Sequence, residues 1–295
     1  MKKNRYKSYF ATMLIWCGIT FPTMAQEAPK FTVAEAPEWS ALFKRKDGWF
    51  GADGIFVLPV NGVDKDKNKA KTMMLVFSDT MIGKIKGTSL QPGFKMIHNS
   101  VAILKGEAAQ DKNISFYWKS DRKGSPQPLF KPKTKNSGPG EYFWLGDGFV
   151  NNDMDKATYI FAYRIKDTGG AVFGFAEKGN VLIKIPAGSK PPFLDQKQMD
   201  TPFYIAGNTD SETGSFGGGI FVNTANAGAQ SPDGFVYVYG VKGSEKNVIV
   251  ARVEPGKFEQ FKEWKFWDGG TWNSDIRKVA GIADHASNAS SGDGA

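Results

Sequence analysis

The feature that most constrains the fold of this chain is a repeated set of short, strand-like apolar runs. Three sets of four runs begin near residues 49, 142 and 215. The runs lie at 51–60, 72–80, 100–104, 114–118, 142–150, 157–165, 181–185, 202–205, 215–222, 234–239, 248–253 and 263–267. No long stretch keeps the 3.6-residue apolar period of an amphipathic helix. Repeated four-stranded units predict an all-β fold, a β-propeller, with a β-sandwich as the alternative.

The repeat stops before a ring can close. A fourth unit opens near residues 279–288 and runs into a tail without an apolar pattern. About three blades and a stub do not make a closed propeller. We therefore expect residues 26–295 to form a β-propeller domain that is incomplete at its C-terminus. An intact short protein with an unusual end, or a truncated chain without function, are the alternatives.

Residues 1–25 have the pattern of a secretory signal peptide. A basic start precedes a mostly apolar stretch at 9–21, and small residues end at Ala25. We predict export to the periplasm or outside the cell. The apolar stretch is short for a membrane span, and no other apolar run of 18 residues occurs. A lipoprotein anchored at Cys17 is the alternative, although Trp16 is a poor fit before a lipidated cysteine.

Cysteine and charge exclude several function classes. Cys17 is the single cysteine and lies inside the signal, so zinc–thiolate sites and cysteine nucleophiles are excluded from the mature chain. We predict no cofactor and no metal site, with a central structural ion such as calcium left open. Four positive charges of the net +8 lie in residues 1–25, which leaves about +4. The lysines are scattered through loops, which argues against nucleic-acid binding.

Two acidic residues flank the first predicted hairpin. Asp53 opens the strand at 51–60, and Asp79 closes the strand at 72–80. Antiparallel pairing brings these ends to one edge of the sheet. Two carboxylates at a sheet rim can divide acid and base roles, which is the arrangement that glycoside hydrolysis needs. Turn chemistry is the competing interpretation, because Asp-Gly and Ser-Asp-Thr are common in turns.

Other polar residues converge on the same face in a propeller. In each predicted blade, the first and third strands start at this face and the second strand ends at it. The glycine run at 217–219 also lies at this face. We predict substrate-binding roles for His98, Asn99, Trp144, Asp147 and Arg164. The amide and imidazole would bind sugar hydroxyls, and Trp144 and Trp49 would stack on sugar rings. We expect Arg164 to pair with a carboxylate of the funnel, while structural roles for His98 and Asp147 are equally open.

Several motifs resemble those of one known family. They are Asp53-Gly54, Leu58-Pro59, Phe77-Ser78-Asp79-Thr80, His98-Asn99-Ser100, Trp144-Leu145-Gly146-Asp147-Gly148, Pro232-Asp233-Gly234 and, in outline, His285 to Asn288. This set resembles a bacterial five-bladed β-propeller family formerly of unknown function, whose wider furanosidase group includes endo-D-arabinanases acting on mycobacterial arabinan. Ser78 stands where that family has glycine.

The resemblance implies a secreted glycoside hydrolase that cleaves an arabinan-type furanosidic polysaccharide. Asp53 and Asp79 would be its catalytic residues, with their acid and base or nucleophile roles unassigned. The partner would be a polysaccharide or oligosaccharide, with no nucleic acid and no membrane span. A non-catalytic carbohydrate-binding propeller is the alternative function.

Overall fold

The computed structural model describes residues 31–63, 72–170 and 174–282, so the predicted signal peptide and most of the predicted fourth unit lie outside the described residues. The chain divides into two units after Ala36, and the second unit, from Pro37 onward, holds every helix and strand that the structure describes. The one α-helix among the described residues is α1 (Pro37–Ala41). None of the helices described has the length and apolar character that crossing a membrane requires.

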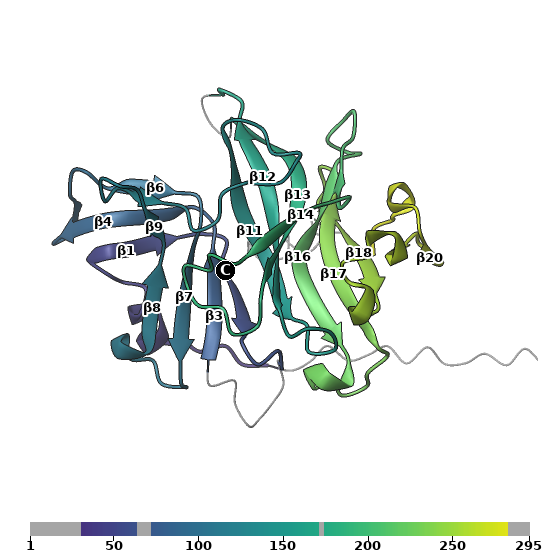
Figure 1. The fold of residues 1–295 in the computed structure, drawn as a ribbon, viewed down its shortest axis with the longest axis horizontal. Helices are drawn as coiled ribbons and strands as arrows, with labels where there is room; N and C mark the ends of the chain where they lie inside the picture. The colour runs from purple at the N-terminus through teal and green to yellow at the C-terminus, as the bar shows by residue number, and fades with distance from the viewer. Residues whose placement is uncertain (1–30, 64–71, 171–173, 283–295) are drawn as a thin grey trace, which may run out of the picture. The chain divides into compact units, whose positions relative to one another are not determined.

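The unit from Pro37 onward is all-β and contains three large antiparallel sheets (Figure 1). Sheet I joins β2 (Phe56–Pro59), β3 (Thr72–Phe77), β7 (Ser100–Lys105) and β8 (Ile114–Tyr117). Sheet II joins β11 (Glu141–Val150), β12 (Thr158–Asp167), β13 (Phe175–Ile185) and β14 (Lys197–Thr201). Sheet III joins β15 (Tyr204–Ile205), β16 (Gly214–Asn223), β17 (Phe235–Lys242), β18 (Asn247–Val253), β19 (Lys265–Trp267) and β20 (Trp272–Asn273).

Smaller elements surround these sheets. A small sheet contains β1 (Asp47–Ala52), β4 (Thr80–Lys86), β5 (Ser89–Leu90) and β6 (Lys95–Ile97), and β9 (Lys119–Ser120) pairs with β10 (Pro126–Gln127). Five 3₁₀-helices are described: η1 (Asp111–Asn113), η2 (Ala225–Ala227), η3 (Pro255–Lys257), η4 (Phe261–Glu263) and η5 (Ile276–Lys278).

The first predicted hairpin is bent, so the single strand predicted at 51–60 is wrong. Its outer part, β1 and β4, belongs to the small sheet, and its inner part, β2 and β3, belongs to sheet I. Gly54 lies at the bend with φ of +58°, in the left-handed region that favours glycine. A Cβ atom on Gly54 would lie 2.7 Å from Ser78 Oγ. The backbone at the bend therefore requires glycine.

The fourth strand of the second set also differs from the prediction at 202–205. Sheet II ends with β14, and Tyr204 and Ile205 instead pair with β16 of sheet III. The sequence of β14 is Lys-Gln-Met-Asp-Thr, and none of its residues is fully buried. An outer strand of this kind needs no apolar alternation, so hydrophobicity did not reveal it.

The strands β2, β11 and β16 lie side by side and run in the same direction. A Cβ atom on Gly146 of β11 would meet the Gly217 carbonyl oxygen of β16 at 2.5 Å. Both glycines sit where the register with the next strand shifts, at equivalent bulges of sheets II and III. Leu58 of β2 lies beside Gly148. We call the two ends of these strands the strand-start face and the strand-end face.

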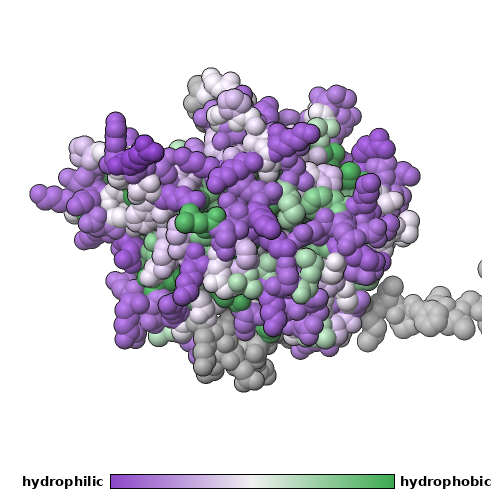
Figure 2. Space-filling model, viewed as in Figure 1, coloured by the Kyte–Doolittle hydropathy of each residue, from purple (hydrophilic) through white to green (hydrophobic). Residues whose placement is uncertain are grey.

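Apolar side chains fill the spaces between the sheets. Sheets I and II share a buried cluster that includes Val76 and Phe143, and sheets II and III share one that includes Phe161 and Trp264. Each such side chain contributes roughly 1.5–3 kcal/mol by burial. The surface drawn in Figure 2 is mainly hydrophilic, with apolar areas that are small and separate.

Trp49 belongs to a third buried cluster, under the small sheet. Its ring stacks on Phe116 with centroids 4.3 Å apart, and its indole N–H donates to Ser100 Oγ at 3.2 Å. The predicted sugar contact of Trp49 is therefore wrong, because only 3% of the residue is exposed.

Candidate functional site

Asp53 and Asp79 lie opposite each other at the bend of the hairpin, on the strand-start face. The Asp53 N–H donates to the Asp79 carbonyl oxygen at 3.1 Å, and the Ser78 N–H donates to the Asp53 carbonyl oxygen at 3.0 Å. The predicted juxtaposition of the two residues is confirmed. Because both backbones are held by this pairing, the two side chains start from fixed positions at one rim.

The Asp79 carboxylate is held by two ring N–H groups. Asp79 Oδ1 accepts from Trp144 Nε1 at 2.9 Å and lies 3.0 Å from His98 Nδ1. A carboxylate only accepts, so His98 Nδ1 is the donor in this contact. The side chains of Asp79 and His98 remain 23% and 30% exposed. The clamped carboxylate is thus open to a ligand.

Ser78 fastens β11 beside Asp79. Its buried hydroxyl donates to the Leu145 carbonyl oxygen at 3.2 Å and accepts from the Leu145 N–H at 3.0 Å. Leu145 follows Trp144, so these bonds hold the indole next to the carboxylate. Ser78 therefore has a structural role in this chain.

Asp53 has the altered proton affinity expected of one member of an acid–base pair. Partial loss of hydration at the rim raises the pKa of Asp53, and the negative charge of Asp79 raises it further. Hydrogen bonds from the backbone N–H groups of Asp79 and of Asp53 itself act in the opposite direction. A carboxyl that keeps its proton to a higher pH is suited to general acid catalysis.

Tyr142 completes the edge of the site and was not predicted. Its ring stacks on His98 with centroids 3.7 Å apart. Its hydroxyl donates to Asp167 Oδ1 at 2.9 Å. Burial, this hydrogen bond and the nearby charges of Asp167 and Asp79 raise the pKa of Tyr142, so the phenol stays protonated. In the sequence, only the position of Tyr142 two residues before Trp144, on the same predicted strand, indicated that it lies near the site.

Asn99 is next to His98 in sequence but points into the protein. Its amide donates to the carbonyl oxygens of Phe130 and Phe143 at 2.9 and 3.0 Å, and it accepts from the Phe130 N–H at 2.7 Å. The residue is fully buried. Asn99 therefore holds the backbone between sheets I and II and presents no atom to a ligand.

Arg164 is also buried, and it pairs with carboxylates, but not with the two of the aspartate site as we expected. Its Nε lies 3.1 Å from Glu141 Oε2, and its Nη1 lies 3.6 Å from Asp200 Oδ1. Its Nη2 donates to the Lys178 carbonyl oxygen at 2.7 Å. These contacts connect β12 with β11, β13 and β14, so the guanidinium holds sheet II together rather than lining the aspartate site.

Asp147 occupies the bulge of β11 and bridges two sheets. Its Oδ2 accepts from the Ile220 N–H of β16 at 2.7 Å, and its Oδ1 accepts from the Gly148 N–H at 2.8 Å. These bonds favour the structural interpretation of Asp147. Of the predicted residues, His98 and Trp144 are the two that the fold brings to the aspartate pair.

A cleft of about 530 Å³ opens beside Trp144, between sheets II and III. Trp144, Tyr163, Phe175, Glu177, Ser215 and Tyr239 contribute to its lining. Burial raises the pKa of Glu177 to about 8, although the Ser215 hydroxyl and the charge of Lys246 partly oppose this. Glu177 was missed because nothing in its local sequence distinguishes it from a surface glutamate at the start of a strand.

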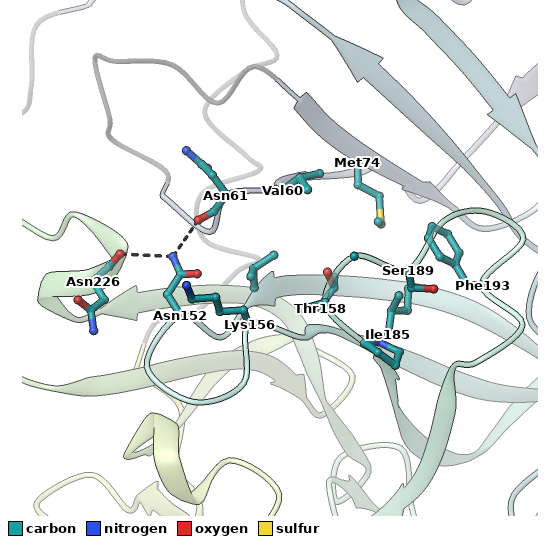
Figure 3. Close-up of a pocket in the computed structure, with 14 residues that line it drawn as sticks. Val60, Asn61, Met74, Asn152, Lys156, Thr158, Ile185, Ser189, Phe193 and Asn226 are labelled. Atoms are coloured by element: carbon teal, nitrogen blue, oxygen red, sulfur yellow. Dashed lines mark hydrogen bonds between the residues drawn. The ribbon is translucent and has the colours of Figure 1, made fainter.

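A second cavity, of about 660 Å³, lies at the strand-end face (Figure 3). Its rim is closed by the Asn152 amide, which donates to the carbonyl oxygens of Asn61 at 2.8 Å and Asn226 at 3.4 Å. One side chain thus joins the loops that follow β2, β11 and β16.

The described residues include no group of three or more His, Cys, Asp or Glu side chains placed to hold a metal ion.

Comparison with known proteins assigns the family. Residues 37–291 match the family described as the domain of unknown function DUF5005. The chain belongs to the DUF5005 family. No curated protein matches it.

A solved structure has the same fold as this DUF5005 chain. It comes from Bacteroides ovatus and is described as a "putative hydrolase". The two structures superpose with a TM-score of 0.57 at 18% identity, over 81% of this chain and 58% of the other. The chain therefore spans little more than half the length of that protein. At this identity the likeness concerns the fold alone.

Proposed function

We propose that this DUF5005 chain is a glycoside hydrolase that cleaves a furanosidic polysaccharide of the arabinan type through Asp53 and Asp79. The observation that carries the proposal is the clamped Asp79 carboxylate opposite Asp53 at an open rim. The description of the Bacteroides ovatus protein as a hydrolase supports the reaction class. The resemblance of the Asp53 and Asp79 motifs to the furanosidase group supports the substrate class.

The environments of the two carboxyls support different roles. Asp53, with its raised pKa, is the general acid that protonates the leaving glycosidic oxygen as the bond to the anomeric carbon breaks. Asp79 is the carboxylate that attacks the anomeric carbon or activates water. Trp144 and His98 are positioning residues, because their N–H groups fix the Asp79 oxygen that each contacts.

Sheets I, II and III are, in this proposal, consecutive blades of a β-propeller. The side-by-side first strands β2, β11 and β16 are the inner strands, and the equivalent bulges at Gly146 and Gly217 support a repeated unit. The strand-start face is then the funnel that holds Asp53 and Asp79. As in the resembling family, a complete ring has five blades.

Substrates with different leaving groups test the acid assignment. The Asp53→Asn variant should lose hydrolysis of arabinan by at least about 100-fold, the usual contribution of general acid catalysis. It should retain much more activity on a nitrophenyl arabinofuranoside, whose leaving group needs no proton. Asp79→Asn should lose both activities. The control is Asp47→Asn, because Asp47 lies on β1 with a 73% exposed side chain.

The outcomes separate the two candidate functions. Wild-type chain that releases no reducing sugar from arabinan or arabinogalactan, and no nitrophenol, would contradict the hydrolase proposal. Wild-type chain that binds arabinan without hydrolysing it, with binding that persists in Asp79→Asn, would instead support a non-catalytic carbohydrate-binding protein. Equal losses in Asp47→Asn and Asp79→Asn would contradict the assignment of the site.

Export is part of the same proposal. A polysaccharide hydrolase has to reach a substrate outside the cytoplasm, and residues 1–25 carry the signal-peptide pattern. The N-terminal sequence of the chain recovered from periplasm or medium should begin at Gln26. A chain that keeps Met1 and stays with the cytoplasmic fraction would contradict export.

A further inference from the structure

The cleft between sheets II and III has the size and lining of a ligand site. Its volume of about 530 Å³ lies within the range of roughly 300–1,000 Å³ found for small-molecule sites. The walls are mostly apolar and aromatic, with Tyr163 from β12, Phe175 from β13 and Tyr239 from β17. The Phe175 ring packs edge-to-face on Trp144 with centroids 4.6 Å apart. Aromatic rings of this kind give flat apolar surfaces on which sugar rings can stack.

One residue connects this cleft to the aspartate pair. Trp144 lines the cleft, and the N–H of the same indole donates to Asp79 Oδ1 at 2.9 Å. The cleft is therefore adjacent to the catalytic carboxylate of the proposed function. A chain of sugar units bound at Asp79 can extend past Trp144 into the cleft.

A carboxyl group lies among these apolar walls. Glu177 Oε1 accepts from Ser215 Oγ at 2.7 Å, and Ser215 Oγ lies 3.3 Å from Asn180 Nδ2. The hydroxyl of Ser215 is thus oriented toward Glu177. The other carboxyl oxygen, Oε2, has no hydrogen-bond partner among the described residues. Glu177 keeps a polar atom for a ligand in a cleft that is otherwise apolar.

We propose that this cleft binds a neutral sugar unit next to the one cleaved at Asp79, with the ring stacked on Tyr239 and a hydroxyl hydrogen-bonded to Glu177. The proposal rests on the proposed function for the identity of the polysaccharide. Burial raises the pKa of Glu177 to about 8, so the carboxylic acid is protonated at neutral pH and donates to the sugar hydroxyl. A negatively charged sugar gains no cationic partner from the residues that line the cleft.

Substrates of different length test the subsite. The probes are a linear arabino-hexasaccharide and a nitrophenyl arabinofuranoside, which is too short to enter the cleft. Tyr239→Ala should lower the ratio of their kcat/KM values, hexasaccharide over aryl substrate, by about tenfold. Tyr237→Ala is the matched control, because Tyr237 lies on the same strand and is half-buried but does not line the cleft. It should leave the ratio unchanged.

Glu177 adds a readout that a merely structural role would not give. The KM for the hexasaccharide should rise above about pH 8 in the wild type, as Glu177 ionises and loses its donor. Glu177→Gln keeps an N–H donor and should remove this pH dependence, while Glu177→Ala should raise KM at every pH. Three other titratable groups interact electrostatically with Glu177. The charge of Lys246 lowers the pKa of Glu177, and the charge of Glu177 raises the pKa values of Tyr163 and Tyr204.

The results distinguish the two proposals. Hydrolysis of both probes with an unchanged ratio in Tyr239→Ala would overturn the subsite and leave the hydrolase. Binding of the hexasaccharide by wild-type chain in calorimetry, without hydrolysis, lost in Tyr239→Ala and kept in Tyr237→Ala, would support the subsite and overturn the hydrolase. Neither binding nor hydrolysis by folded wild-type chain would overturn both.

Discussion

The substitution Glu177→Gln should make the stability of this protein less dependent on pH. Burial in the cleft raises the pKa of Glu177 from 4.5 to about 8. Between these values the unfolded chain releases a proton that the folded chain keeps. The folded state therefore loses stability as the pH rises from about 4.5 to about 8, and the loss is complete above that range. Glutamine has the shape of the protonated acid, accepts from Ser215 in the same way, and does not titrate.

The size of the effect follows from the two pKa values. One pKa unit corresponds to about 1.4 kcal/mol, and most of the shift of Glu177 is expressed between about pH 5 and pH 8. Glu177→Gln should therefore gain about 3 kcal/mol of unfolding free energy relative to wild type over this interval. For a domain of this size that equals roughly 6–12 °C in melting temperature. The charge of Lys246 stabilises the ionised form of Glu177, and this effect is already contained in the pKa of about 8.

Melting temperatures of wild type and Glu177→Gln at several pH values provide the assay. Other groups titrate over the same interval, but the difference between the two proteins isolates residue 177. The two curves should lie together near pH 5 and separate as the pH rises to 8. A difference that stays constant within about 1 kcal/mol would refute the reasoning, because Glu177 would then ionise in the folded state much as it does in the unfolded chain.

Three further substitutions probe the contacts that build the site, each measured by thermal or urea unfolding. Gly54→Ala should cost about 2 kcal/mol, because φ is +58° and the new Cβ would lie 2.7 Å from Ser78 Oγ. Asn99→Ala should cost about 3 kcal/mol, because it leaves three buried backbone groups without their partner. Arg164→Met should cost about 3 kcal/mol or more, because the buried Glu141 carboxylate loses its cation.

Matched controls are available for these substitutions. Gly51→Ala should be nearly neutral, because a Cβ atom there meets nothing within 4 Å. Asn136→Ala removes an exposed amide and should change stability by less than about 0.5 kcal/mol. The double variant Arg164→Met with Glu141→Gln should recover part of the loss, since the buried Glu141 charge is removed together with its cation. Equal effects in the variants and their controls would contradict these assignments.

The juxtaposition of Asp53 and Asp79 was predictable because a hairpin is local. Antiparallel pairing of two strands joined by one connection brings the start of the first beside the end of the second, whatever the rest of the fold does. The three sets of strands were predictable for a related reason. Apolar alternation marks β17, whose residues are buried in turn, and a nearly continuous apolar run marks β12, most of whose residues are buried.

The bend within the hairpin depended on longer-range packing. Asp53-Gly54 reads equally well as a turn or as part of a strand. The contact of Gly54 with Ser78, and of Ser78 with Leu145 of another sheet, decides that the hairpin divides between two sheets. The sequence also did not predict the outer strand β14, because a polar strand at the edge of a sheet has no apolar pattern.

The chemistry of individual polar residues was decided by the tertiary structure. The sequence alone established that the fold is all-β, that sets of strands repeat along the chain, and that two carboxylates lie on one hairpin. The packing of three sheets then buried Asn99 and Arg164, opened a cleft at Glu177 and set Trp144 against Asp79. The physical reason is that hydrogen bonding along a hairpin is set by neighbours in the chain. Burial, and with it the proton affinity of a side chain, is set by residues that only the complete fold brings near.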